Sequence, residues 1–310
     1  MDPLTAIAFL AAVFMGISIG ASSVAPSFAP VNSAGGSNVM RLALIAGIFA
    51  FLGAVLQGQN VADTVGSGIL MGQIGLLQAV SILAVGSTLV IVSVLTDYPM
   101  PTAFTVVGAV IGSGIGFGNA VNWSEVSMIV GFWVGTPLVA LLLAYIFAKL
   151  IRRYISKENS EKLINRLLLI SGAYVAYTAG AASVGLAVGP LSTLNTSSSM
   201  LLLVGGLSIL LGSWMISPRI IKAVAFDYSN VGPRKAVHAL AAPGLLAQIG
   251  IQIGAPVSFN LAIVAAVIGS GMVEGRGNKS DDKIYRTLIA WIGAFLLAVA
   301  LTAALGLLFG

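Results

Sequence analysis

Two short motifs place serine hydroxyls beside glycine and proline in an otherwise apolar chain. They are GASSVAPSFAP, Gly20–Pro30, and GAASVGLAVGP, Gly180–Pro190, which share five of eleven residues at an offset of 160. Glycine and proline favour a break in a helix, and hydroxyls beside such a break can donate hydrogen bonds to an anion. Ser23 and Ser183 occupy the same repeat position, which favours ligand binding over simple helix packing for this pair.

A second pair of segments carries proline and a hydroxyl at the start of an apolar helix. PMPTAFTVVGAVIGSG, Pro99–Gly114, and PVSFNLAIVAAVIGSG, Pro256–Gly271, share eight of sixteen residues. Helix starts expose N–H groups and roughly half a positive charge, so two converging starts form an anion site without basic side chains. The shared AVIGSG ends are interpreted as close-packing surfaces. The predicted substrate ligands are Ala21, Ser22, Ser23, Val24, Thr102, Ser183, Val184, Ser258 and Asn260.

The composition indicates the elements that must position these residues. Of 310 residues, 58% are hydrophobic and 8% are charged, whereas a soluble domain carries about three times that charge fraction. The long apolar segments lack the alternation of a membrane β-barrel, so we expect an all-α polytopic membrane protein. The absence of cysteine excludes disulfides, and a single histidine argues against a metal site. No cofactor and no catalytic residue is predicted, because one histidine and dispersed acids form no enzymatic cluster.

The repeats divide the chain into two related halves. Residues 1–150 form the first half, 151–165 a basic linker, and 166–310 the second half. Each half is expected to cross the membrane five times and to hold one short amphipathic piece, at 61–70 or 217–231. Because five crossings is an odd number, the second half enters the membrane from the opposite side, and the two halves have inverted topology. In such repeats, broken helices or re-entrant hairpins from the two halves meet at the bilayer midplane. The expected crossings are 3–30, 39–56, 75–96, 101–117, 124–150, 166–189, 199–216, 237–253, 257–273 and 284–309.

The charges agree with this topology. All fifteen Lys and Arg residues fall on the side of the central linker, and the other side keeps only the acids Asp2, Asp63 and Glu125. The positive-inside rule therefore makes the linker side cytoplasmic and places both termini outside a multi-pass cell membrane protein. If a re-entrant hairpin replaces a full crossing in either half, the distribution of Lys and Arg between the two sides has to be counted again. Topology accounts for the net charge of +5, so no nucleic-acid partner is expected.

These motifs resemble the inorganic phosphate transporter family, which includes a sulfate permease branch. The family signature, approximately Gly-Ala-Asn-Asp-Val-Ala-Asn followed by Gly-Pro, is similar to Gly20–Pro30 and Gly180–Pro190, and its Pro-x-Ser motif to Pro256–Ser258 and, degenerately, Pro99–Thr102. The resemblance implies that aspartates of the phosphate carriers help to bind sodium and substrate. In this chain Ser22-Ser23 and Ala182-Ser183 replace both Asn-Asp pairs.

The loss of both aspartates favours sulfate over phosphate. Sulfate carries no proton and is best held by donors alone, whereas phosphate gains from an acceptor, and a buried carboxylate beside sulfate costs several kcal/mol. We predict a secondary active transporter that imports a tetrahedral oxyanion by alternating access, with proton coupling favoured over sodium. A phosphate transporter coupled to either ion and a passive anion channel are the alternatives. Membrane lipid surrounds the chain, and a homodimer is compatible with the sequence.

Overall fold

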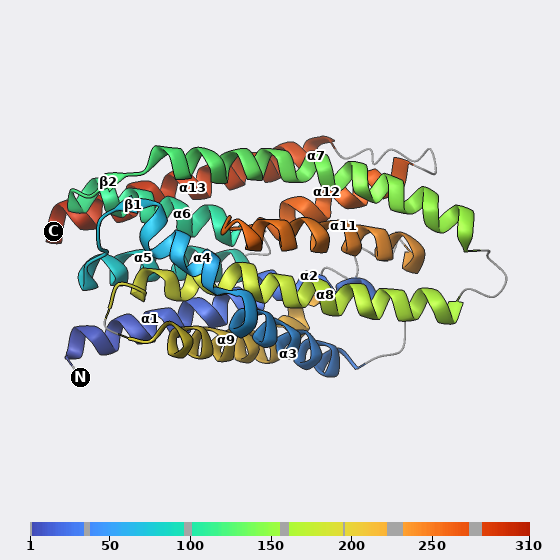
Figure 1. The fold of residues 1–310 in the computed structure, drawn as a ribbon, viewed down its shortest axis with the longest axis horizontal. Coiled ribbons are helices and arrows are strands. Elements are labelled where there is room, and N and C mark those ends of the chain that lie inside the picture. Colours follow the sequence, from blue (N-terminus) through green and yellow to red (C-terminus); the bar gives the residue numbers. More distant parts are fainter. Residues whose placement is uncertain are drawn as a thin grey trace.

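The computed structural model describes residues 2–33, 38–95, 101–155, 161–194, 196–221, 232–272 and 281–310, and these residues are almost entirely helical (Figure 1). The predicted all-α membrane fold is confirmed. Within the described ranges, seven helical stretches are long and apolar enough to cross a membrane: Pro3–Asn32, Val39–Gln57, Leu76–Leu95, Trp123–Tyr154, Glu161–Leu191, Ser198–Met215 and Ile289–Phe309.

The first half runs from α1 to α7. Its elements are α1 (Pro3–Ile19), the π-helix η1 (Gly20–Val24), α2 (Ala25–Ser33), α3 (Val39–Gln57), α4 (Gln59–Asp63), the π-helix η2 (Thr64–Gly68), β1 (Leu70–Met71), α5 (Leu76–Leu95), α6 (Thr102–Phe117), β2 (Ala120–Val121) and α7 (Trp123–Tyr154). The predicted amphipathic piece at 61–70 therefore spans parts of α4 and β1 and all of η2.

The second half runs from α8 to α13. Its described elements are α8 (Glu161–Val188), the 3-10 helix η3 (Gly189–Leu191), α9 (Ser198–Met215), α11 (Gly232–Gln252), α12 (Phe259–Met272) and α13 (Asp281–Phe309). Most of the second predicted amphipathic piece, 217–231, lies outside the described residues.

Helices α5 and α6 form a hairpin. Strand β1 precedes α5 and pairs antiparallel with β2, which follows α6, so the hairpin starts and ends at the same end of the molecule. Its tip reaches Ser23, deep within the span Pro3–Asn32, because Thr102 at the start of α6 is hydrogen-bonded to Ser23. The expected crossings at 75–96 and 101–117 are the two arms of this hairpin, and its first arm, Leu76–Leu95, is long and apolar enough to cross a membrane.

Helices α11 and α12 form a second hairpin, which lies toward the opposite end of the molecule in Figure 1. The turn uses Gly254 at φ 74°, and the Gly254 N–H bonds to the Ile251 carbonyl at 3.2 Å. The Asn60 side chain on α4 donates to the carbonyls of Ile251 and Gln252, both at 3.2 Å, and so caps the end of α11. The expected crossings at 237–253 and 257–273 are therefore the two arms of one hairpin.

The two serine motifs depart from α-helical geometry in different ways. Gly20–Val24 is a π-helical turn inside a helix that continues to Asn32 through Pro26 and Pro30. Helix α8 stays α-helical through Gly180–Val184 and ends at Val188, so within the predicted motif Gly180–Pro190 the α-helix gives way to the 3-10 turn Gly189–Leu191. A π turn shifts the hydrogen-bond ladder by one residue, and Ser217 donates to the Gly20 carbonyl at 2.9 Å.

Glycines let the helices of the two halves approach closely. A Cβ atom on Gly180 would collide with the Ala50 carbonyl of α3, so this glycine of the second motif serves packing. In the two AVIGSG copies, Gly112 faces the Val299 backbone of α13 and Gly269 the Leu141 backbone of α7. Each hairpin thus packs on the last long helix of the other half, which confirms the interpretation of AVIGSG as a packing surface.

Charge is separated along the long axis of the molecule. Both termini lie at one end in Figure 1, while the end of α7 and the start of α8 lie at the other. The acids Asp2, Asp63 and Glu125 belong to elements near the end that carries the termini. Arg219 follows α9, and the other described basic residues occupy the starts of α3, α8, α11 and α13 and the end of α7: Arg41, Lys149, Arg152, Arg153, Lys162, Arg166, Arg234, Lys235, Lys283 and Arg286.

Candidate functional site

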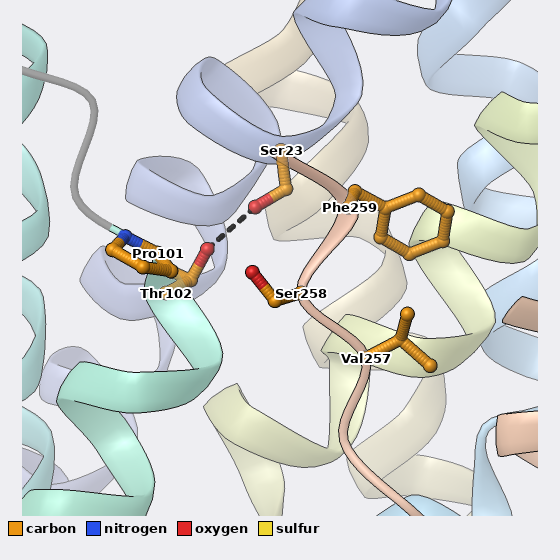
Figure 2. Close-up of a pocket in the computed structure, with 6 residues that line it drawn as sticks. All are labelled: Ser23, Pro101, Thr102, Val257, Ser258 and Phe259. Carbon is orange, nitrogen blue, oxygen red and sulfur yellow. Dashed lines mark hydrogen bonds between the residues drawn. The ribbon is translucent and has the colours of Figure 1, made fainter. Parts of the chain in front are cut away.

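A small pocket lies where the two hairpin tips meet the first helix (Figure 2). Its free volume is about 10 Å³, which is room for about one water molecule. Six residues from three segments line the pocket: Ser23, Pro101, Thr102, Val257, Ser258 and Phe259.

Ser23 enters the pocket from the π-helical turn of the first helix. Its side chain is buried, and its Oγ lies 2.6 Å from Thr102 Oγ1, a hydrogen bond in which either hydroxyl can be the donor. One of the two hydroxyls therefore retains a proton that is not used in their mutual bond. The pair can therefore donate one hydrogen bond into the pocket.

Two helices begin at the pocket wall. Pro101, at φ −73° and ψ 118°, lies outside the helical region, so α6 starts at Thr102. Helix α12 starts at Phe259, and the Ser258 carbonyl accepts its first helical bond, from Ala262 N at 3.2 Å. The first N–H groups of a helix have no carbonyl partner in their own helix and carry partial positive charge. The sequence prediction that hydroxyl-bearing helix starts converge is therefore confirmed for Thr102 and Ser258.

Ser258 has an unsatisfied hydroxyl. The side chain is 4% exposed, and its Oγ has no hydrogen-bond partner among the described residues. Figure 2 shows this oxygen directed toward Ser23 and Thr102. A buried hydroxyl without a hydrogen-bond partner costs about 1–3 kcal/mol. A group that accepts a hydrogen bond from this hydroxyl would remove that cost. The Ser258 hydroxyl is therefore available to donate a hydrogen bond within the pocket.

Five further predicted ligands, all with described side chains, do not line this pocket: Ala21, Ser22, Val24, Ser183 and Val184. Ser22 donates to the Ser18 carbonyl of its own helix at 2.9 Å, and Ser183 is buried at 2% exposure in α8. Val184 packs against the faces of Gly58 and Gly205. Ala21 and Val24 are fully buried around the π turn, and the side chain of Asn260 lies outside the described ones.

Sequence reasoning missed the residues that support the hairpin tips. Val257 and Phe259 line the pocket beside Ser258, and their adjacency to the Pro-x-Ser motif was the available signal. Trp133 on α7 donates from Nε1 to the Pro256 carbonyl at 2.7 Å, and its ring stacks on Phe104 with centroids 3.9 Å apart. No local sequence pattern pointed to this tryptophan.

The part of the chain that the structure describes contains no group of three His, Cys, Asp or Glu side chains that could hold a metal ion. None of the six residues that line the pocket is acidic or basic. The polar groups that the pocket offers are therefore hydroxyls and the N–H groups of two helix starts.

Comparison with known proteins gives a consistent result. The sequence model of the Phosphate transporter family matches residues 19–163 and again residues 155–302. The chain is 28% identical to the sulfate permease CysP of Bacillus subtilis (strain 168), over 97% of this chain and 87% of that protein. Its fold superimposes with a TM-score of 0.85 on a solved structure, the sodium-dependent phosphate transporter, at 22% identity, covering 98% of this chain and 97% of the other.

Proposed function

Because the chain belongs to the Phosphate transporter family, we propose that it is a secondary active transporter that imports a tetrahedral oxyanion, with sulfate as the favoured substrate. The substrate binds between the two hairpin tips, at Ser23, Thr102 and Ser258. Transport rather than catalysis is the activity, in keeping with the family.

The unpaired, buried Ser258 hydroxyl is the observation that carries this proposal. It faces the Ser23–Thr102 pair, and the starts of α6 and α12 flank the same space. Hydroxyls and helix N-termini together donate to an anion and stabilise its charge without a basic side chain. A cation would find hydroxyl oxygens there but also the positive ends of two helices, so an anion fits better.

Sulfate is favoured over phosphate by the chemistry of the lining. Near neutral pH phosphate keeps at least one proton and gains from an acceptor, such as a carboxylate, that takes its P–OH. Ser22-Ser23 and Ala182-Ser183 stand where the family signature has Asn-Asp, and none of the pocket residues carries a carboxylate. A cage made only of donors suits a fully ionised oxyanion. The name of the Bacillus subtilis relative, a sulfate permease, supports this choice.

The arrangement of the hairpins supports alternating access. One tip belongs to each half, and the two hairpins extend toward opposite ends of the molecule (Figure 1). Moving one hairpin opens the pocket to one side, and moving the other opens it to the other side. The halves, 1–150 and 166–310, are then inverted repeats joined by the linker 151–165. The basic end faces the cytoplasm and both termini lie outside the cell.

Energy coupling uses protons in this proposal. Moving a dianion inward costs about 2.3 kcal/mol per charge per 100 mV, or about 4.6 kcal/mol for sulfate, so more than two cations must accompany it if the membrane potential is to help. Serines occupy the positions of the family's sodium-binding aspartates. Neutral oxygens alone form a weak sodium site, whereas protons can move through water in an open cavity.

Uptake of labelled sulfate by proteoliposomes tests the substrate and the coupling. Sulfate should accumulate under an inward pH gradient without sodium, and excess unlabelled phosphate should compete poorly. Preferential competition by phosphate would replace sulfate with phosphate as the substrate. Accumulation only under an inward sodium gradient would overturn proton coupling, and equilibration without accumulation under both gradients would identify a passive pathway.

A further inference from the structure

Trp133 contacts both hairpin tips with a single side chain. The indole Nε1 donates to the Pro256 carbonyl at 2.7 Å, in the segment that precedes α12. The same ring stacks on Phe104 of α6, with centroids 3.9 Å apart and an angle of 12° between the planes. Trp133 is 4% exposed, so both contacts are shielded from solvent and lipid.

These contacts lie next to the proposed ligands. Phe104 is two residues beyond Thr102, and Pro256 is two residues before Ser258. The two hairpins come from different halves of the chain and no covalent bond joins their tips. A rigid, planar ring that stacks on one tip and hydrogen-bonds to the other fixes the distance between them.

We propose that Trp133 is a positioning residue that sets the width of the oxyanion site and thereby its selectivity for anion size. This inference rests on the proposed function of the pocket. Helix N-termini donate well to an anion only at hydrogen-bonding distance, so the separation of the tips decides which tetrahedral anion meets both at once. Trp133 holds that separation at a narrow value, which favours sulfate over the larger molybdate and tungstate.

The contacts of Phe104 support a role in spacing rather than general packing. Phe104 also contacts Trp291 of α13, with centroids 6.3 Å apart and a tilt of 50°. The tip of the first hairpin is therefore held between the long helices α7 and α13, and Trp133 also hydrogen-bonds to the second tip. Loss of that bond frees the Pro256 carbonyl and allows the tips to separate.

The test is the Trp133→Phe variant, which keeps an aromatic ring for stacking and removes the N–H donor. We expect its KM for sulfate to rise about fivefold to tenfold, the size of one hydrogen bond, while its KM for molybdate stays constant or falls. Phe104→Leu removes the aromatic stack with Trp133, and it should likewise lower the preference for sulfate over molybdate. The matched control is Trp214→Phe, at a tryptophan of α9 that is 42% exposed and does not line the pocket.

Monodispersity and thermal stability are measured for every variant, so that misfolding is recognised. A structural role alone would reduce the uptake of sulfate and molybdate by the same factor, and that result in both folded variants would overturn the inference. If the wild-type protein neither binds nor transports any of these anions, the proposed function fails instead. An unchanged sulfate-to-molybdate ratio in Trp133→Phe, with wild-type transport intact, contradicts the positioning role only.

Discussion

Replacing Ser23 by aspartate places a fixed negative charge in a site that the account makes a donor-only cage. Ser23 is buried, and its Oγ is 2.6 Å from Thr102 Oγ1, so a carboxylate there lies within about 4 Å of a bound anion. Two unit charges at that distance repel by about 4 kcal/mol at an effective dielectric constant of about 20, and a dianion doubles this to about 8 kcal/mol. Ser23→Asp should therefore abolish sulfate binding.

The matched control for this prediction is Ser23→Asn, which has nearly the shape of aspartate without its charge. Its sulfate affinity should fall only moderately, because an amide can still donate a hydrogen bond. Equilibrium binding of labelled sulfate is measured for both variants at neutral and at alkaline pH, since a proton on the aspartate would cancel its charge. Equal sulfate affinity of the two variants at alkaline pH would refute the assignment of Ser23 to the site.

Three further substitutions test neighbouring parts of the argument. Thr102→Val keeps the shape of the side chain but removes a pocket hydroxyl, and should raise the KM for sulfate about fivefold or more in uptake assays. Ser22→Ala should leave that KM unchanged, because the Ser22 hydroxyl bonds within its own helix; a large rise would return Ser22 to the site. Gly180→Leu should lower the thermal stability by about 1–3 kcal/mol or prevent folding, since its side chain meets the Ala50 backbone. Gly131→Leu, at a glycine with open space around it, is its control.

The sequence predicted the membrane fold and all three hydroxyl residues that line the pocket at the hairpin tips. Low charge and long apolar runs leave only helices as a solution in lipid. Thr102 and Ser258 were predicted because proline before a hydroxyl marks a helix start, and this signal is local. Ser23 was predicted from its place in a repeated motif, and the structure places it in the pocket.

Ser183 shows where the repeat argument exceeded its evidence. The motifs at Gly20 and Gly180 are similar in sequence, yet Gly20–Val24 forms a π turn while Gly180–Val184 stays α-helical. The first motif has a proline three residues after Ser23, whereas the second has its proline seven residues after Ser183, and Gly180 is used to approach Ala50. Small residues serve both close packing and ligand contact, so sequence similarity alone does not distinguish the two uses.

Crossings and hairpins were also difficult to separate from sequence. Helix α5 has 20 residues and the composition of a full span, yet the pairing of β1 with β2 returns the chain to the end where the hairpin began. That pairing joins Leu70 to Val121 and Met71 to Ala120, a contact between distant segments that carries no local signature. Trp133 escaped notice for the same reason, because its partners Phe104 and Pro256 are far away in the chain.

The most direct test of the central claim is equilibrium binding of labelled sulfate to the purified protein and to the triple variant Ser23→Ala, Thr102→Val, Ser258→Ala. The account predicts saturable binding by the wild-type protein, weaker displacement by phosphate than by unlabelled sulfate, and no measurable binding by a folded triple variant. Binding by that variant with the affinity of the wild-type protein would contradict the claim that the hairpin tips hold the oxyanion.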